Sequence, residues 1–322
     1  MNHNQRFFNL KSKWKELILS SDKKNIRIRD AARQLDVSEA ELLSTKINNN
    51  VKFLLITDYE ILFKQIFNSV DKLMFLIRND YAVHEKNIST KKIKIIDNKI
   101  INLDENNQTL LSFDYSDFKF CFYELKNHAG RKLSSFQIFD KYGCSLLKIY
   151  NKDDDYHNFE KVFLKYYADY NYELQSIQKN KQIDNSANLD SINRYYLKSN
   201  YSLKNNDIKN KNILRFIITC ASKGKCPIQI HVIGNNSIQY HRDIVENIKD
   251  FGPWFNVIDK YFNIHVLESK IKRSQFIEYT IKDKKYYSIE CLDQFNKHVV
   301  GITSVIKFEQ DFLNILNEGG LL

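Results

Sequence analysis

Residues 73–85 read LMFLIRNDYAVHE, and this stretch guides the interpretation of the whole chain. Its first five residues form an apolar run of the length of a buried strand. The next eight bring together an arginine, a histidine and two carboxylates. A segment of the same kind, GNNSIQYH at residues 234–241, follows a second strand-like segment, IQIHV, at residues 228–232. A buried strand followed by a polar segment with a histidine thus occurs twice, which indicates an internal duplication.

The duplication extends beyond these two segments. The aromatic segment at residues 254–265 resembles the aromatic strand predicted within residues 113–125, and the hairpin pattern at residues 287–303 resembles the one at residues 136–150. Each half then ends in an amphipathic helix. The period is roughly 150 residues. We therefore expect an α+β fold with two tandem structural repeats, each a large antiparallel β-sheet with flanking helices.

A polar, non-periodic segment separates the two halves. Residues 171–212 are rich in Asn, Ser and Lys, and a short aromatic patch interrupts them at residues 192–196. Long connections without periodicity are typical of linkers. We predict an N-terminal repeat at residues 1–170 with a helical start followed by an antiparallel sheet, a linker at 171–212, and a C-terminal repeat at 213–322.

Size and composition set the broad class. The 322 residues are 43% hydrophobic, and only 8 are Gly and 2 are Pro, so a sizeable core is expected and a disordered chain is excluded. Lys and Arg number 49 and Asp and Glu 39, which gives a net charge of 49 − 39 = +10. The basic residues are spread along the chain with acids between them. We interpret this charge as a solvated surface and expect no nucleic-acid partner.

Cysteine usage and the N-terminus indicate the compartment. The 5 cysteines are odd in number and show no CxxC spacing, so reduced thiols in a reducing compartment are predicted. The first residues contain no apolar signal segment, and no apolar run reaches transmembrane length. We expect a cytoplasmic protein without membrane insertion.

Helices are expected over residues 9–70. Ser38 and Glu41 have the spacing of a capping box, so a second short helix begins there after one that ends near Leu35. Two short helices joined by a tight turn resemble a helix-turn-helix. A DNA-reading helix would expose base-contacting groups at its start, whereas this one presents Glu39 and Glu41, which repel phosphate. We interpret the pair as a packing element.

Strand patterns follow residue 73. Residues 91–97 and 99–103 have the pattern of a hairpin that turns at Asn98. The run at residues 118–125 predicts an aromatic strand, and residues 135–139 and 145–150 predict a second hairpin. An amphipathic helix follows, with its apolar residues between 159 and 166.

Motifs of a known family lie in order along nearly the whole chain. Residues 29–42 read RDAARQLDVSEAEL, residues 78–85 read RNDYAVHE, and residues 135–150 contain SFQIFDKYG and LKIY. The chain resembles the cytoplasmic haemin-degrading or haem-trafficking proteins of the HemS/ChuS/HmuS family, which has R-D-I-A-x-x-L-x-I-S-E-A-E-L, R-N-E-Y-A-V-H-E and S-I-Q-F-F-D-x-x-G-x-A-L-L-K-V-Y. Further matches are Gly234-Asn235, WFNV at 254–257 and FNIH at 262–265. The resemblance implies a fold of two tandem repeats and haem as the cofactor.

The departures from the family pattern fall on its haem contacts. The resemblance places the usual ligand histidine in a D-[VT]-H-x-F-F patch, but residues 191–196 read SINRYY, so Asn193 stands in its place. An amide is a poor ligand for haem iron. A family arginine is replaced near Phe113. Gly301 and Thr303 stand where the glutamine and tyrosine of a C-terminal Q-x-Y-x-x-R would fall.

Haem iron needs an axial donor, and its propionates need basic groups. His84, in the best-matched motif, is the first candidate iron ligand; the alternative is an imidazole hydrogen-bonded to Asp80 or Glu85. Arg78 is a candidate for a bidentate propionate contact, or else a surface ion-pair partner.

Other candidates flank Asn193. Tyr195 and Tyr196 could supply a phenolate to ferric iron, or fill a core where the family has two phenylalanines, and Arg194 could meet a propionate. His241 is a further candidate for cofactor contact; the alternative for it, as for His265, is a core histidine satisfied by polar neighbours. His128, His157 and His298 sit in turn-like or polar contexts and are expected at the surface.

The resemblance implies a cytoplasmic haem-binding protein that accepts imported haem for trafficking, for oxidative degradation that releases iron, or for both. The alternative is a degenerate family member that acts as a non-catalytic haem-binding or interaction module, because the usual ligand is lost. Expected partners are haem and a haem-import system or a haem-accepting enzyme, with the chain as a monomer or homodimer. The sequence leaves open whether the protein is an enzyme.

Overall fold

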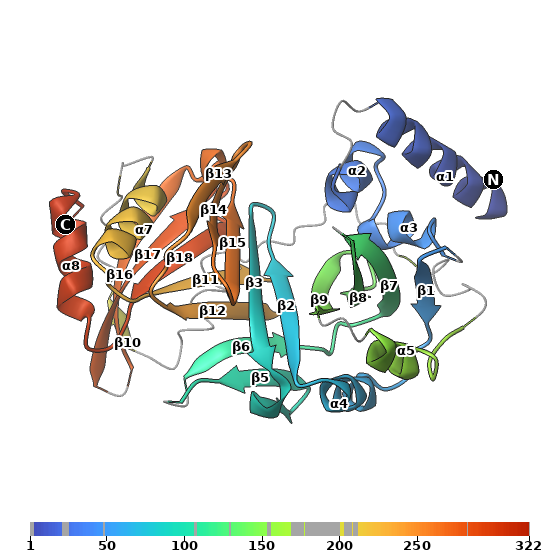
Figure 1. Ribbon diagram of the computed structural model, residues 1–322. Coiled ribbons are helices and arrows are strands. Elements are labelled where there is room, and N and C mark those ends of the chain that lie inside the picture. Colours follow the sequence, from blue (N-terminus) through green and yellow to red (C-terminus); the bar gives the residue numbers. More distant parts are fainter. Residues whose placement is uncertain are drawn as a thin grey trace. The chain divides into compact units, whose positions relative to one another are not determined.

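The computed structural model describes residues 3–20, 26–47, 49–105, 108–128, 130–152, 156–168, 177, 200–202, 208, 212–281 and 283–321 (Figure 1). The chain forms two compact units. The first contains residues 1–75, 88–91 and 115–184, and the second contains residues 76–87, 92–114 and 185–322. Residues 76–87 and 92–114, from the first half of the sequence, therefore belong to the second unit. The predicted boundaries of the two repeats, at residues 170 and 212, stay a prediction.

The first unit begins with helices and continues with an antiparallel sheet. Its helices are α1 (His3–Ser20), α2 (Ile28–Gln34), α3 (Glu39–Ser44), α4 (Tyr59–Ser69), the 3₁₀ turn η1 (Thr90–Lys92) at its border, and α5 (His157–Phe163). Its strands are β1 (Val51–Leu54), β7 (Phe120–His128), β8 (Arg131–Phe139), β9 (Ser145–Asn151) and the first half of β2 (Lys72–Arg78), in the order β1-β7-β8-β9-β2. The expectation of helices throughout residues 9–70 is wrong at β1, where Val51 pairs with Glu124 at the edge of the sheet.

The predicted capping box is confirmed. The Ser38 side chain accepts a hydrogen bond from the Glu41 backbone N–H at 3.2 Å, and the Ser38 N–H donates to Glu41 Oε2 at 2.9 Å. These bonds satisfy two of the free N–H groups at the start of α3. The helices α2 and α3 bury Ala31, Ala32 and Leu42 in a cluster with Trp14 of α1, so this pair of helices packs within its unit.

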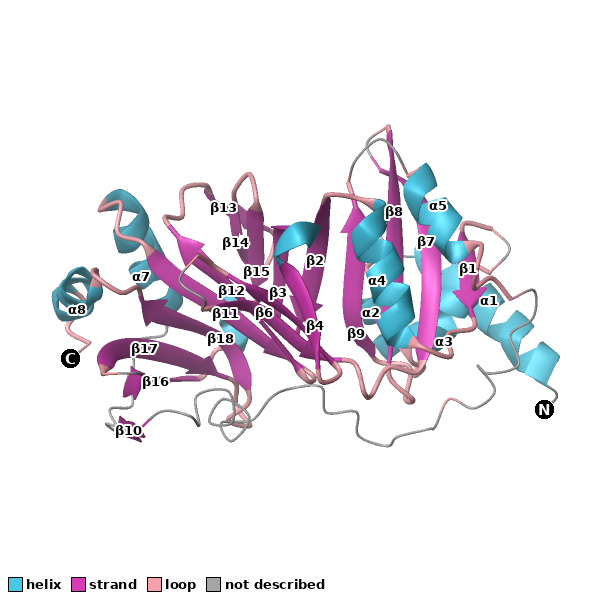
Figure 2. Ribbon diagram, turned by 90° about the horizontal axis from the view of Figure 1, so that it is seen from below, coloured by secondary structure: helices cyan, strands magenta, loops and turns pink. Residues whose placement is uncertain are grey.

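Helices cover both faces of the first unit's sheet. On one face, α3 packs with Phe53 and Phe122, whose rings meet edge to face at 5.5 Å. On the other, Phe163 of α5 stacks on Tyr123 at 4.2 Å. Figure 2 shows α4 and α5 beside each other over this second face. Because both faces are covered, the consecutive residues 120–123 of β7 (Phe, Cys, Phe and Tyr) are all buried, and the strand shows no apolar–polar alternation there.

The second unit contains a complete sheet and part of another. Its helices are α7 (Ile213–Lys223), α8 (Glu309–Glu318) and the 3₁₀ turn η3 (Glu268–Lys270). One sheet has the order β10-β16-β17-β18-β11-β12-β6-β5-β4; beside the end of β2, the other continues as β3-β15-β14-β13. The bounds are β3 (Ala82–Ser89), β4 (Ile93–Ile96), β5 (Lys99–Leu103), β6 (Thr109–Asp114), β10 (Asn200–Ser202), β11 (Ile228–Gly234), β12 (Ser237–Asp243), β13 (Ile248–Phe251), β14 (Trp254–Ile258), β15 (Phe262–Val266), β16 (Arg273–Ile281), β17 (Lys284–Leu292) and β18 (His298–Ser304).

The strand order confirms the duplication and shows an exchange between the repeats. The three-stranded meander β4–β6 of the first half joins β12 of the second half, with Leu111 opposite Gln239. The corresponding meander β13–β15 joins β3, with Ile264 opposite His84. The fold class is therefore confirmed, as α+β with tandem repeats and large antiparallel sheets. The match of residues 254–265 to the aromatic strand is wrong, because they form the hairpin β14–β15, whose counterpart is β5–β6.

Local turn chemistry agrees with the predicted hairpin at residues 91–103. Asp97 and Asn98 have φ of 47° and 60°, and Ile96 pairs with Lys99 across them. Positive φ at both central residues is the requirement of a two-residue type I′ hairpin turn, and Asp and Asn tolerate it well.

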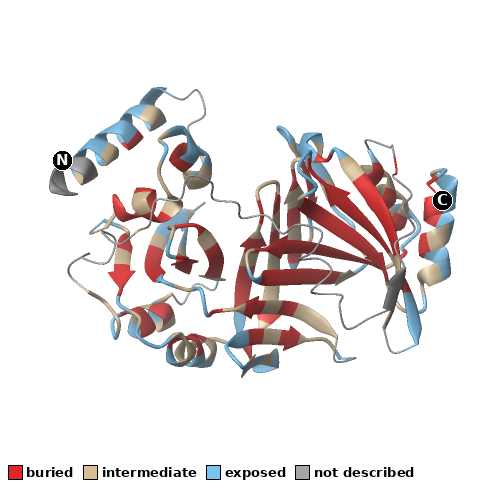
Figure 3. Cartoon of the chain, turned by 180° about the vertical axis from the view of Figure 1, so that it is seen from behind, coloured by how far each residue is buried: buried red, intermediate tan, exposed pale blue. Residues whose placement is uncertain are grey.

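The core of the second unit lies between the sheet strands and α7. The apolar side chains of α7 pack with Ile230 and Ile302 of one sheet and with Phe255 and Ile264 of the other. Figure 3 shows the resulting continuous burial along these strands. No helix in the described part of the chain is both long and apolar enough to cross a membrane. The five cysteines are all free thiols, as expected.

Substitutions at two glycines, Gly143 and Gly130, test the contact between α3 and the β8–β9 turn. Gly143 has φ +75°, its carbonyl accepts from the Ala40 N–H at 3.1 Å, and a Cβ there would lie 2.7 Å from Ser38 Cβ. Gly130 has φ +81° but nothing within 4 Å of its Cβ position. We predict that Gly130→Ala costs about 1–2 kcal/mol from backbone strain, whereas Gly143→Ala costs about 3 kcal/mol or more because crowding adds to that strain. Urea denaturation of the two variants measures the difference, and equal losses would contradict the assigned contact.

Candidate functional site

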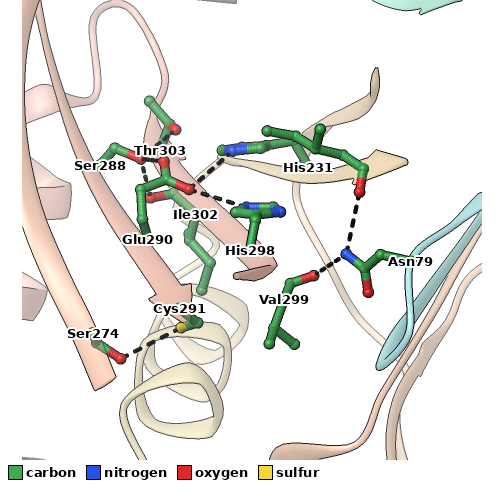
Figure 4. A network of polar contacts seen from close by, with 11 residues as sticks. Asn79, His231, Ser274, Ser288, Glu290, Cys291, His298, Val299, Ile302 and Thr303 are labelled. Carbon is green, nitrogen blue, oxygen red and sulfur yellow. Dashed lines mark hydrogen bonds and ion pairs between the residues drawn. The ribbon is translucent and has the colours of Figure 1, made fainter. Parts of the chain in front are cut away.

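Asn79 lies at the centre of the stretch at residues 73–85. It follows β2 and is 1% exposed. Its Oδ1 accepts hydrogen bonds from the backbone N–H groups of Tyr81 at 3.0 Å and Ala82 at 2.9 Å. Its Nδ2 donates to the carbonyls of Ile233 at 3.2 Å and Val299 at 2.8 Å (Figure 4). All four hydrogen-bonding positions of the amide are therefore used.

The turn held by Asn79 meets the equivalent turn of the second half. A Cβ on Gly234 would lie 2.9 Å from the Arg78 carbonyl oxygen and 2.6 Å from Ser237 Oγ, so only glycine fits there. The polar segments at residues 78–85 and 234–241, noted first as a repeated pattern, thus pack directly against each other. The sequence did not single out Asn79, whose role is structural.

His84, the first candidate ligand, is fully buried. It lies on β3 and is 0% exposed, with its ring 4.9 Å from that of Phe262. Neither ring nitrogen forms a hydrogen bond of ordinary geometry within the described part of the chain. Burial lowers the pKa of His84 well below its usual value, and Lys86 and His241 lower it further, while Gln239, as a hydrogen-bonding neighbour, opposes them. The imidazole is therefore neutral at physiological pH.

His241 shares this interior with His84. It lies on β12, and its ring stacks on Phe262 at 3.8 Å with an angle of 6°. Burial, followed by the charge of Lys86, lowers its pKa to about 3. The Lys86 ammonium donates to the Tyr240 carbonyl at 2.9 Å, and burial together with Arg242 lowers the pKa of Lys86 to about 8. Two neutral imidazoles and one cation thus converge around Phe262.

The structure gives fewer contacts, or none, for the other predicted site residues. Arg78 is half-buried at the end of β2. Arg194, Tyr195 and Tyr196, with Asn193, lie outside the described residues. His265 is half-buried, and a hydrogen bond between its Nδ1 and Asn256 Oδ1 at 2.6 Å satisfies it, as expected, although it does not lie in the core.

A second buried polar cluster was not recognised from the sequence. Glu290 of β17 lies 3.2 Å from His231 of β11 and 3.1 Å from His298 of β18, in each case between its Oε2 and the imidazole Nε2 (Figure 4). His231 and Glu290 are 0% exposed and His298 is 1% exposed. The expectation of a surface position for His298 is therefore wrong, because the carboxylate of the neighbouring strand compensates its burial.

The carboxylate of Glu290 is oriented from both sides. Its Oε1 accepts a hydrogen bond from Ser288 Oγ at 2.5 Å, and Ser288 Oγ lies 3.0 Å from Thr303 Oγ1. Burial alone would raise the pKa of Glu290, but His231 and His298 outweigh it and hold the pKa below the ordinary range. Burial lowers the pKa of His298, against the opposing effect of Glu290. The cluster thus contains an ionised carboxylate facing two imidazoles.

Gly301 makes this cluster possible. It pairs with His231 on one side and with Glu290 on the other. A Cβ at Gly301 would overlap the His231 ring and lie 2.5 Å from Glu290 Oε2. Alternation along β17 and β18 would have placed Ser288, Glu290, Gly301 and Thr303 on one face. That signal was present in the sequence, but each polar residue is isolated among apolar neighbours.

Comparison with known proteins identifies the family. The family model described as the haemin-degrading HemS.ChuX domain matches residues 36–166 and 204–311. The chain belongs to the HemS family. Both halves match the same domain, in agreement with the duplicated topology.

Individual relatives are distant in sequence. The HemS-family chain is 23% identical over 289 residues to the hemin transport protein HmuS of Yersinia pestis, covering 81% of this chain and 82% of that protein. Its fold matches the heme-degrading enzyme ChuS of Escherichia coli O157:H7 with a TM-score of 0.79 at 17% identity, covering 96% of this chain and 98% of that one. The heme-binding protein PhuS of Pseudomonas aeruginosa, in its holo form, gives 0.77 at 19% identity, covering 96% and 97%.

Substitution of the buried amide tests the junction between the two turns. We predict that Asn79→Ala lowers the free energy of unfolding by about 4 kcal/mol, because two N–H groups and two carbonyls lose their partner in a dry environment. Asn247→Ala is the matched control, since its amide bonds the exposed Asp259 at 2.9 Å, and it should cost less than about 1 kcal/mol. Urea denaturation of both variants measures the two losses, and an Asn79 loss as small as the control would disprove the role.

The pH dependence of stability tests the burial of His241. Because its pKa is lowered to about 3 in the folded state, the unfolded chain binds more protons between that pH and the ordinary histidine pKa. Stability is therefore lost as the pH falls through this window, and His241 accounts for a loss of about 2 kcal/mol between pH 7 and pH 5. Between pH 7 and pH 5, the free energy of unfolding of His241→Gln should therefore fall by about 2 kcal/mol less than that of the wild type. His157→Gln is the control, since His157 is exposed and pairs with Glu160, and it should retain the wild-type slope.

Proposed function

We propose that this HemS-family chain is a cytoplasmic haem-binding protein that accepts imported haem for trafficking, for oxidative degradation that releases iron, or for both. Family membership over both repeats supports the proposal. The relatives support it through their names, which describe a hemin transport protein, a heme-degrading enzyme and a heme-binding protein. The expected partners are haem and the import system or enzyme that exchanges it.

His84 is the iron ligand that we propose. Its imidazole is neutral because burial and Lys86 lower its pKa, and a neutral imidazole is the form that binds iron. Its nitrogens lack hydrogen bonds of ordinary geometry to described residues, so the donor chemistry fits. Access is closed in this structure, because the ring is 0% exposed and packs against Phe262. Haem binding at His84 therefore requires Phe262 to move.

Basic and aromatic groups complete the proposed haem environment. Haem, when bound, supplies the iron that activates oxygen. The chain's own residues orient it: Arg78 and Arg194 are proposed for the propionates, and His241 for a contact beside Phe262. Tyr195 and Tyr196 are the proposed alternative iron donors, since they flank Asn193 at the position of the usual ligand.

The alternative function belongs to another class. The chain would then be a non-catalytic haem-binding or interaction module that has kept the family fold. The observation that favours this alternative is Asn193, whose amide cannot replace an imidazole as an iron ligand.

Haemin titration tests the main proposal. Purified protein should shift the Soret band saturably at micromolar haemin with one haem per chain. His84→Ala should weaken binding by at least about tenfold, the smallest effect expected when a metal ligand or its support is removed. His265→Ala is the matched control, since His265 is already bonded to Asn256, and it should bind as the wild type does. Absence of a Soret shift in the wild type would reject haem binding, whereas an unchanged His84→Ala spectrum would reject His84 alone.

Two further measurements separate the alternatives. Tyr195→Phe and Tyr196→Phe should leave the spectrum unchanged if His84 is the ligand, and should remove a phenolate charge-transfer band if a tyrosine is. The haem complex should then be given a reductant and oxygen. A biliverdin-like product supports degradation, and a stable Soret band without product supports the non-catalytic module.

A further inference from the structure

We propose that His231, Glu290 and His298 form a binding site for a first-row divalent transition metal ion, such as Zn²⁺ or Fe²⁺. The ligand atoms of these three side chains all lie within 4.8 Å of one another. Two imidazoles and one carboxylate are the ligand set that such ions take in non-haem sites. The three residues come from the adjacent strands β11, β17 and β18 of one sheet, so the backbone holds them in place.

The distances within the cluster suit coordination. Both Nε2 atoms face the same oxygen, Glu290 Oε2, at 3.2 Å from His231 and 3.1 Å from His298. Ligands that bind one ion at about 2.0–2.2 Å in tetrahedral or octahedral geometry lie roughly 3.0–3.5 Å from each other. Two of the three ligand pairs therefore lie at the spacing that one metal ion requires, and the ligand atoms of the two histidines lie within 4.8 Å of each other.

The surroundings have the character of a built site. Ser288 Oγ donates its one proton to Glu290 Oε1 at 2.5 Å and accepts from the Thr303 hydroxyl at 3.0 Å. The bond from Ser288 holds Oε1 of Glu290, and Oε2 points to the two imidazoles. Groups beyond the direct ligands orient carboxylate ligands in the same way in metal sites. Gly301 supplies the space, because any side chain there would occupy the position where His231 meets Glu290.

The buried His–carboxylate cluster differs from the ordinary pair elsewhere in the chain. His157 and Glu160 lie 2.8 Å apart at the solvent side of α5, with one imidazole and one carboxylate. We expect such a surface pair to bind no ion tightly, because solvent competes and no third ligand lies beside it among the residues that the structure describes. It therefore provides a matched internal control for metal titrations.

The test is metal binding to the chelator-treated full-length protein, with no haem present. Zn²⁺, Co²⁺ and, without oxygen, Fe²⁺ are added to the folded protein and, separately, during refolding, because the site is closed to solvent. We expect one tightly bound ion per chain by elemental analysis. X-ray absorption should show a shell of nitrogen and oxygen without sulfur, which distinguishes this site from the five cysteines. A sulfur-containing shell, or no saturable binding by either route, would overturn the proposal.

Variants locate the ion. Glu290→Gln and His298→Gln should weaken binding by at least about 100-fold, and Ser288→Ala, which keeps all three ligands, by about 10-fold. His157→Gln should bind as the wild type does. Unchanged affinity in folded Glu290→Gln would overturn the site, and if that variant does not fold, Ser288→Ala and the wild-type absorption spectrum still decide. None of these outcomes depends on whether the protein binds haem.

Discussion

The side-chain amide of Asn79 is the interaction on which the arrangement of the second unit depends. Its Oδ1 accepts hydrogen bonds from two N–H groups of the tight β2–β3 turn. Its Nδ2 donates to two backbone carbonyls, one on β11 and one on β18. A buried amide with every donor and acceptor used stabilises only the one geometry that satisfies all four bonds. It therefore fixes the position of the β2–β3 turn relative to the sheet that holds His231 and His298, and the close approach at Gly234 follows from it.

Two buried polar interiors result, and their chemistry differs. Around Phe262, His84 and His241 lie near the cationic Lys86, and burial keeps both imidazoles neutral. Around Gly301, an anionic carboxylate holds two imidazoles in hydrogen-bonding range. Burying such groups is costly unless partners compensate. The second interior has its compensation within the protein, through the contacts between Glu290 and the two imidazoles, whereas neither nitrogen of His84 in the first has a hydrogen bond of ordinary geometry to a described residue.

The sequence predicted the fold class well and the site only in part. Alternation, hairpin turns and the capping box are local signals, and each led to the correct element at residues 38–41 and 91–103. The exchange of β4–β6 and β13–β15 is a pairing between distant strands, and nothing local encodes it, so residues 254–265 were matched to the wrong strand. His298 was misplaced for the same reason, because its partner Glu290 lies on another strand and its burial depends on that pairing. Asn79 was overlooked because a polar residue after a strand is the usual sign of an exposed turn.

The exchanged meanders have a consequence for the order in which the molecule can be assembled during synthesis. When the ribosome has completed β4–β6, the strand that they pair with, β12, has not yet been made, and β3 awaits β15. The nascent first half therefore carries two unpaired strand edges for at least as long as it takes to translate the 122 residues between β6 and β12 (115–236), which is on the order of ten seconds. Such edges invite pairing with other chains. A chaperone that shields these edges would need to act in this interval.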